Sequence, residues 1–411
     1  MELNWLNRWS VSTPARDAPK IRNGRLRTVS FGGVDGQVYC RLGRHRPVLD
    51  ERRATLPDRA RNTSPEYNCT VPLFTRGKAK AVARNLTQLE LLLELEPVAA
   101  DNVDRHLAMA KEWHPHDYVP WDRGRDFAAL GGTDWDPAQS ALSEVAAAAM
   151  ITNLLTEDNL PSYHREIAEN FSQDGAWGTW VGRWTAEENR HGIVMRDYLV
   201  VTRGVDPVAL EQARMAHMAT GYSAMAVVDA KAGPDARLAA DAGLLYSVAY
   251  VTFQELATRV SHRNTGRACD DPVADRMLAR IAADENLHMI FYRNLCAAAL
   301  DLAPDQTLEA ITTIVTGFQM PGAGMPGWRR NGVLMAKHGI YDLRQHLEEV
   351  LLPVLRKWNV FERTDLGPRG ERSRERLAAF LDRLRADVVR FEEQRDRALA
   401  REARRREQQP V

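Results

Sequence analysis

Two Glu–His pairs with the same spacing constrain the fold of this chain more than any other feature. Glu188 and His191 are three residues apart, and Glu285 and His288 repeat that spacing later in the chain. On an α-helix, residues three apart lie on one face, about one turn from each other. A carboxylate beside an imidazole suits iron or manganese, and some helical bundles hold two metal ions with one such pair from each of two helices. The two pairs therefore predict a helical bundle around two metal ions.

Two further acids complete the set of ligands that such a bundle requires. It needs one more Glu from each of two other helices. Glu157 and Glu255 each follow a long apolar run, and a buried carboxylate is costly unless it is paired or binds a metal. Either residue alone would more often be an ordinary ion-pair partner, but together with the two pairs they make a full ferritin-like di-iron set. The predicted metal ligands are Glu157, Glu188, His191, Glu255, Glu285 and His288.

An acid directly precedes the Glu of each pair, Glu187 in the first and Asp284 in the second. A ligating His usually donates its other N–H to a carboxylate, which fixes the orientation of the ring. We expect Asp284 to accept from His191 and Glu187 to accept from His288, each across the site. The alternative for Glu187 is a side chain that points to solvent.

Thr258 lies one turn beyond Glu255. Its hydroxyl would there face the metals, where it could relay protons or hold dioxygen. The alternative is a hydrogen bond from the hydroxyl to the backbone one turn back, as Thr often forms in helices.

Helical periodicity covers most of the chain after residue 85, and Gly and Pro mark the turns. Helices are predicted at 86–112 (through Pro97), 138–170 (kinked near Pro161), 177–202, 206–218, 236–263, 271–301, 305–318, 327–338, 342–357 and 370–406. There are no alternating strand segments and no glycine-rich phosphate loops. The sequence therefore predicts an all-α fold, with a ferritin-like four-helix bundle inside a larger helical domain at 85–395.

The two ends of the chain differ from this domain in composition. Residues 1–80 hold 16 Lys and Arg against 7 Asp and Glu, an excess of nine in a chain that is neutral overall. Residues 1–84 show no sustained period, so we predict a basic disordered extension; an arm that attracts acidic partners is the alternative. Residues 396–411 are predicted to be a charged C-terminal tail.

Cysteine content and hydropathy indicate the cellular compartment of the protein. Its four cysteines show no paired spacing, which is typical of a reducing compartment. The start has no basic and apolar secretory pattern, and no apolar stretch is long enough to span a membrane. We expect a cytoplasmic protein that neither spans the membrane nor binds nucleic acid.

Six motifs, in this order, resemble the soluble acyl-[acyl-carrier-protein] desaturases, of which plant stearoyl desaturase is the familiar example. The resemblance runs from about residue 86 to 395. The motifs are Lys111–Pro120, Thr156–Tyr163, Trp184–Gly192, Phe253–Thr258, Ser261–Thr265 and Ala283–His288.

The resemblance implies the same six iron ligands, with Glu188 and Glu285 as bridging carboxylates between two iron ions per chain. It also implies an electron path in which Trp113 and Asp284 lead to His191, and a role for Thr258 on the dioxygen side. The family fold is a ferritin-like core within a larger all-α domain, usually in a homodimer.

The reaction implied by the resemblance removes two hydrogens from adjacent carbons of an acyl chain on acyl carrier protein, in fatty acid biosynthesis. The product is a cis double bond, ferredoxin and its reductase supply electrons, and dioxygen becomes water. Such a C–H bond has no acidic proton, so acid–base groups cannot attack it, whereas iron with dioxygen can.

Two other functions are compatible with the ligands. One is another di-iron oxygenase, such as an acyl hydroxylase of a specialised pathway, against which the surroundings of Trp113 and Thr258 favour the desaturase. The other is a ferritin-like iron-binding protein, but this chain is far longer than a storage bundle needs.

The carrier protein would be acidic, yet residues 81–411 carry nine more acids than bases. Arg259, Arg263 and Arg267, four residues apart, form a stripe that we expect to hold the carrier protein or its phosphate, since steering follows the local field. The alternative is that these residues only stabilise the C-terminal end of a helix, where the helix dipole favours positive charge. The resemblance departs from the plant enzymes in the link between His191 and Glu255, which is Ala- and Gly-rich around 218–240 and which we expect to be longer. The position of the double bond is therefore not inferred from the plant enzymes.

Overall fold

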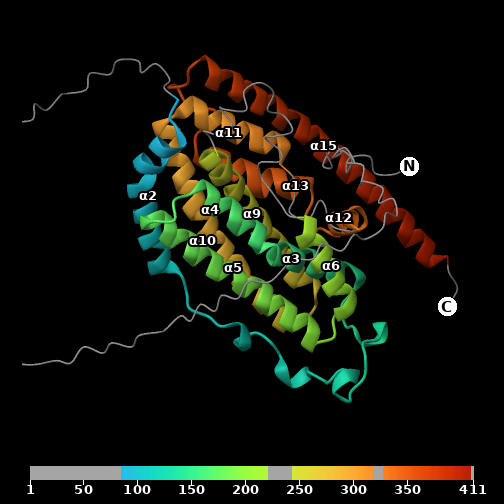
Figure 1. Ribbon diagram of the computed structural model, residues 1–411. Coiled ribbons are helices and arrows are strands. Elements are labelled where there is room, and N and C mark those ends of the chain that lie inside the picture. The colour runs from blue at the N-terminus through green and yellow to red at the C-terminus, as the bar shows by residue number, and fades with distance from the viewer. Residues whose placement is uncertain (1–84, 221–242, 319–326, 409–411) are drawn as a thin grey trace, which may run out of the picture. The chain divides into compact units, whose positions relative to one another are not determined.

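The computed structural model describes residues 85–220, 243–318 and 327–408, all of which belong to one compact unit (Figure 1). Within these ranges the chain forms helices and no strands, which confirms the all-α prediction. The predictions for residues 1–84, and for nearly all of the Ala- and Gly-rich link at 218–240, lie outside the described residues. No helix in the described ranges is long and apolar enough to cross a membrane.

Four helices form the bundle at the centre of the fold. They are α3 (Glu144–Asp158), α5 (Gly175–Val201), α9 (Gly243–Ala268) and α10 (Pro272–Leu302). A three-residue turn joins α9 to α10, so the two helices run antiparallel and pack along one another (Figure 1). Helix α3 packs on α5 and α9, and α10 also packs on α5. This arrangement is the predicted ferritin-like core.

Helix α9 is buried on nearly all sides. From Leu244 to Ala257 its residues are mostly apolar around the whole circumference, and a helical segment of that kind belongs in the interior. It ends at Ala268, five residues beyond the predicted end at 263, because Gly266 does not break it. A Cβ at Gly266 would lie 3.2 Å from the Cα of Asp275 and 3.3 Å from the Cβ of Leu278, so the glycine allows α10 to approach closely.

Helix α2 (Gln88–Met109) lies against α10 and α5. Thr87 and Glu90 form a capping box at its start, and the helix continues through Pro97 as predicted. Its buried face repeats every three or four residues and ends with His106. The chain then leads directly into the segment of Trp113.

The long helix predicted at 138–170 is two helices, α3 and α4 (Leu160–Asn170), which meet at Asn159. Pro161 stands at the start of α4 and has no N–H to donate to the carbonyl four residues back. The prediction of a single kinked helix was therefore wrong, because one helix ends and a second begins at the expected kink. The break leaves Glu157 in the last turn of α3.

Other helices cover the bundle. They are α6 (Pro207–Thr220), α11 (Pro304–Gly317), α12 (Trp328–Lys337), α13 (Leu343–Gln345), the π-helical turn His346–Leu351, α14 (Leu352–Lys357) and α15 (Pro368–Glu407), with 3₁₀ turns at Pro115–Asp117, Trp121–Arg123, Ala128–Leu130 and Pro137–Gln139. Helix α15 packs on α11, buries an apolar stripe that includes Leu377, Leu381 and Leu384, and continues to Glu407. Most of the predicted tail at 396–411 is therefore an exposed helix end (Figure 1).

Candidate metal centre

All six predicted ligands are buried and face one another between the four bundle helices. Helix α3 supplies Glu157, α5 supplies Glu188 and His191, α9 supplies Glu255, and α10 supplies Glu285 and His288. They form two groups, and within each group the ligand atoms lie within 4.8 Å of one another. One group is Glu157, Glu188, His191 and Glu285, and the other is Glu188, Glu255, Glu285 and His288.

Glu188 and Glu285 belong to both groups. One oxygen of Glu188 lies 2.7 Å from Nδ1 of His288, and the other lies 3.3 Å from Nδ1 of His191. Glu285 Oε1 is 3.4 Å from the same His191 nitrogen. The two carboxylates thus lie between the two imidazoles, where each could bind two metal ions at once.

The electrostatics of the centre show a deficit of positive charge. Burial raises the pKa of Glu285 well above its usual value, and the charges of Glu188 and Glu255 raise it further. The pKa of Glu255 is raised for the same reasons, by burial and by Glu188. Burial opposes charge on His288 too, yet hydrogen bonds and carboxylate charges raise its pKa well above the usual value.

The donor atoms of the centre are largely without hydrogen bonds. Both oxygens of Glu285, one oxygen each of Glu188 and Glu255, and Nδ1 of His191 and His288 form no well-aligned hydrogen bond, even where they lie close together, as His288 Nδ1 and Glu188 do at 2.7 Å. Buried polar atoms of this kind are normally satisfied. Four carboxylates balance the charge of two divalent cations, and four Glu with two His is the donor set of di-iron and di-manganese bundles. The residues present therefore fit a pair of metal ions.

Asp284 lies behind His191, as predicted. Its Oδ2 is 3.5 Å from Nε2 of His191 and accepts a hydrogen bond of 2.7 Å from Nε1 of Trp113. The indole is stacked nearly parallel to the His191 ring, with centroids 6.3 Å apart. Arg190 and Arg280 also pair with Asp284. Burial raises the pKa of Asp284, but the hydrogen bond and charge of His191 outweigh it and hold the pKa at about 2.

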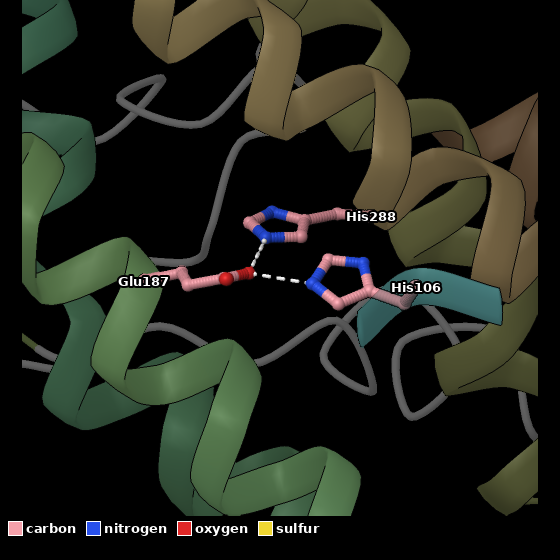
Figure 2. A group of neighbouring side chains, drawn as sticks. All are labelled: His106, Glu187 and His288. Atoms are coloured by element: carbon pink, nitrogen blue, oxygen red, sulfur yellow. Dashed lines mark hydrogen bonds and ion pairs between the residues drawn. The ribbon is translucent and has the colours of Figure 1, made fainter. Parts of the chain in front are cut away.

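Glu187 lies behind His288 and is buried, so the alternative of a solvent-facing side chain was wrong. Its Oε2 is 2.9 Å from Nε2 of His288 and 2.9 Å from Nε2 of His106 (Figure 2). Its Oε1 lies 2.5 Å from Arg183 and 3.6 Å from Arg190. Burial raises the pKa of Glu187, but the hydrogen bonds with the two imidazoles outweigh it and keep the pKa well below its usual value.

Sequence reasoning missed His106 and His262. His106 continues the buried stripe of α2, a pattern that could have predicted a buried histidine in need of a partner. His262 lies 2.8 Å from Oε1 of Glu157, a ligand at the opposite end of the centre. Trp184 donates a hydrogen bond of 3.1 Å to Glu255. Each of these two ligands therefore has one oxygen held by a neighbouring ring.

The Thr258 hydroxyl donates to backbone carbonyls, at 3.0 Å from Glu255 O and 3.2 Å from Gln254 O. This is the backbone contact named above as the alternative. Thr258 is nevertheless buried, in the turn that follows a ligand.

One small cavity lies beside the centre. A cavity of about 10 Å³ lies between α4, α5 and α9, and its walls include Tyr163, Trp184 and Tyr250. That volume holds about one water molecule. Close packing here keeps bulk water away from the buried carboxylates.

Comparisons with known proteins identify one family. A family model described as fatty acid desaturase matches residues 87–409. DesA1 of Mycobacterium tuberculosis H37Rv, classed by name with the acyl-[acyl-carrier-protein] desaturases, is 54% identical over 79% of this chain and 94% of its own length. Chloroplastic acyl-[acyl-carrier-protein] desaturase 7 of Oryza sativa subsp. japonica is 31% identical over 72% of this chain and 75% of its own.

A solved structure gives the same fold. The X-ray structure of DesA2 from Mycobacterium tuberculosis H37Rv superposes with a TM-score of 0.54 and 34% identity, covering 67% of this chain and 97% of DesA2. The resemblance carried by the six motifs is thereby confirmed. The chain belongs to the fatty acid desaturase family.

Proposed function

We propose that this protein is an acyl-[acyl-carrier-protein] desaturase that holds two iron ions in the candidate metal centre. The observation that carries the proposal is the pair of overlapping ligand groups that share Glu188 and Glu285 in a member of the desaturase family. The relatives are named for acyl chains on carrier protein. The proposed reaction introduces a cis double bond into such a chain, with dioxygen as co-substrate and electrons from ferredoxin and its reductase.

In this proposal Glu157 and His191 would hold one iron, Glu255 and His288 would hold the other, and Glu188 and Glu285, which belong to both groups, would serve both. Bound iron with dioxygen supplies the oxidising power that an unactivated C–H bond requires. The protein orients the ligands through the hydrogen bonds described above, and it keeps water out through the packing around them.

Trp113, Asp284 and His191 form the proposed electron path. They are linked by a hydrogen bond of 2.7 Å and a contact of 3.5 Å, and all three side chains are buried. Arg190 lies over the Trp113 ring, 4.7 Å from its centroid, and donates to the backbone carbonyl of Trp113. The indole is therefore held at its N–H by Asp284 and over its ring by Arg190.

The experiment that tests the proposal is a single incubation. Iron-loaded protein is mixed with acyl carrier proteins of several chain lengths, ferredoxin, ferredoxin reductase, NADPH and air, and the products are identified by mass. Loss of two hydrogens from one chain is the expected result, and it identifies the substrate. Gain of one oxygen would assign the protein to the hydroxylases, and many irons per chain would assign it to iron storage.

Thr258 is proposed to act on dioxygen at the metal centre. Its hydroxyl would then have to break its hydrogen bond with the backbone carbonyl of Glu255. Replacing Thr258 with Val is expected to lower the product formed per dioxygen consumed by about 100-fold, the low end of a proton-transfer contribution, without changing the iron content. Thr258→Ser keeps the hydroxyl and is the matched control. If Thr258→Val performs like the wild type, the hydroxyl serves only its backbone contact.

The arginine stripe is proposed to hold the carrier protein, and the structure identifies which members are available. Arg259 and Arg267 are exposed, whereas Arg263 is half-buried and pairs with Asp275 at 3.1 Å. Replacing Arg259 and Arg267 together with Glu is expected to raise KM for acyl carrier protein about tenfold with little change in kcat, because like charges oppose association.

The control for the stripe is Arg383→Glu on the exposed side of α15, which changes the net charge at a distant helix. An unchanged KM in the double variant, or an equal rise in the control, would overturn the assignment of this surface. A homodimer is also part of the proposal, and sedimentation of the purified protein tests it.

A further inference from the structure

The two halves of the metal centre repeat a longer pattern than the Glu–His pairs. On α5, Arg183 stands four residues before Glu187 and pairs with it; on α10, Arg280 stands four residues before Asp284 and pairs with it. Each acid then crosses to the imidazole of the other helix. The local arrangement behind the two imidazoles is thus the same in both halves.

Each acid also contacts a ring from the chain of α2. Trp113, just after α2, donates to Asp284 at 2.7 Å, and His106, within α2, lies 2.9 Å from Glu187. His106 therefore occupies the place beside Glu187 that Trp113 occupies beside Asp284. The electron path proposed above uses Trp113 and leaves His106 without a role.

His106 is held rigidly in that place. It is 1% exposed, its ring stands edge-on to Trp180 with centroids 5.0 Å apart, and it is stacked on His288 at 5.7 Å. Its Nδ1 forms no hydrogen bond, and its Nε2 faces a carboxylate oxygen of Glu187 (Figure 2). A proton on Nε2 is the tautomer that satisfies this contact, so His106 donates to Glu187.

The contact reaches the metal ligand through one atom. Oε2 of Glu187 accepts from both His106 and His288, so the position of that oxygen fixes Nε2 of His288. The opposite nitrogen, Nδ1, then faces Glu188 at 2.7 Å and Glu255 at 3.6 Å. The ring of His288 is thereby turned with Nδ1 toward its ligand group.

His106, Glu187 and His288 also have the composition of a metal site. Two observations favour hydrogen bonds instead. Both imidazole nitrogens lie 2.9 Å from the same carboxylate oxygen, which is an ordinary hydrogen-bond length. The other oxygen faces the guanidinium groups of Arg183 and Arg190, whose charges would repel a bound cation.

We propose that His106 is a positioning residue for the iron at His288: it holds Glu187, which orients the His288 ring. The inference rests on the di-iron centre proposed above and adds to it a residue on a fifth helix. Replacing partners of this kind behind a metal ligand typically weakens metal binding 10- to 100-fold.

The test uses release of iron to a ferrous chelator from reduced, iron-loaded protein. His106→Leu removes the donor, whereas His106→Gln keeps an N–H at similar reach. We expect the wild type and His106→Gln to release two irons slowly, and His106→Leu to release one of its two about 10- to 100-fold faster. Trp113→Phe is the mirror variant, and the double variant with His106→Leu should release both irons fast.

The melting temperature of metal-free protein separates positioning from packing. If His106 served only the core, His106→Leu would destabilise the metal-free and iron-loaded forms equally and leave iron release unchanged, which would overturn the inference. A third metal ion per chain that disappears in His106→Leu would also overturn it. Fewer than two irons in the wild type would instead overturn the proposed function on which it rests.

Discussion

Replacing Glu188 with Gln is expected to leave the protein folded but unable to keep two irons per chain. The side chain lies between His191 and His288, with one oxygen toward each. The amide removes the negative charge that both ligand groups share and leaves a donor oxygen toward only one of them. The ligand set falls from four carboxylates to three. Replacing a residue that only orients a metal ligand typically weakens metal binding or activity 10- to 100-fold. Because Glu188 is itself a ligand, we expect its replacement to lower the rate of desaturation by at least about 100-fold.

Iron analysis and product mass measure this effect, and circular dichroism checks the fold. The matched control is Glu169→Gln, which makes the same chemical change at an exposed position on α4. Full iron content in Glu188→Gln, with normal product formation, would contradict the bridging role.

Removing iron is expected to destabilise the protein and to make its stability depend on pH. A ligand at 100 times its dissociation constant stabilises a fold by about 2.7 kcal/mol. Two such sites correspond to a change in melting temperature on the order of 10 °C. Calorimetry of iron-loaded and metal-free protein measures the difference.

The sign of the pH dependence follows from the carboxylates and imidazoles of the metal-free centre. Burial and neighbouring charges raise the pKa of Glu285 and Glu255 in the folded state, so folding favours their protonated forms. Stability should therefore fall as pH rises above the usual carboxyl range. The raised pKa values of His191 and His288 act in the same direction at higher pH, because their stabilising charge is lost as pH rises through the folded pKa.

Bound iron should remove most of this dependence, since it takes the place of the protons. Buried His346, whose pKa is lowered to about 3, favours the opposite trend but lies outside the centre and acts on both forms alike. From pH 5 to pH 8 the melting temperature of metal-free protein is thus expected to fall relative to that of the iron-loaded protein. Parallel curves for the two forms would contradict a centre whose charge the metal balances.

Sequence alone identified the features that depend on position within one helix. The spacing in the two Glu–His pairs fixes the face on which they lie, and the apolar runs before Glu157 and Glu255 indicate burial. The crossing of Asp284 to His191 and of Glu187 to His288 could be predicted because the two pairs repeat the same order. The structure brings all of these side chains together.

Features that depend on contacts between distant segments could not be predicted in this way. His106 reaches Glu187 only because α2 packs against α5 and α10, and its own surroundings in sequence contain no metal-ligand spacing. The direction of the Thr258 hydroxyl is a choice of side-chain rotamer within a helix, and the backbone carbonyls determine it. Predicting the break at Asn159 would have required knowing that Pro161 begins a new helix and does not lie inside a bent one.

Arg190 contacts the acids of both halves of the centre. Its guanidinium lies 3.6 Å from Glu187 and 3.4 Å from Asp284, so one cation is shared by the acids behind both imidazoles. Without it, Glu187 would keep only the guanidinium of Arg183 and Asp284 only that of Arg280. A single substitution at Arg190 would therefore weaken the support of both imidazoles together.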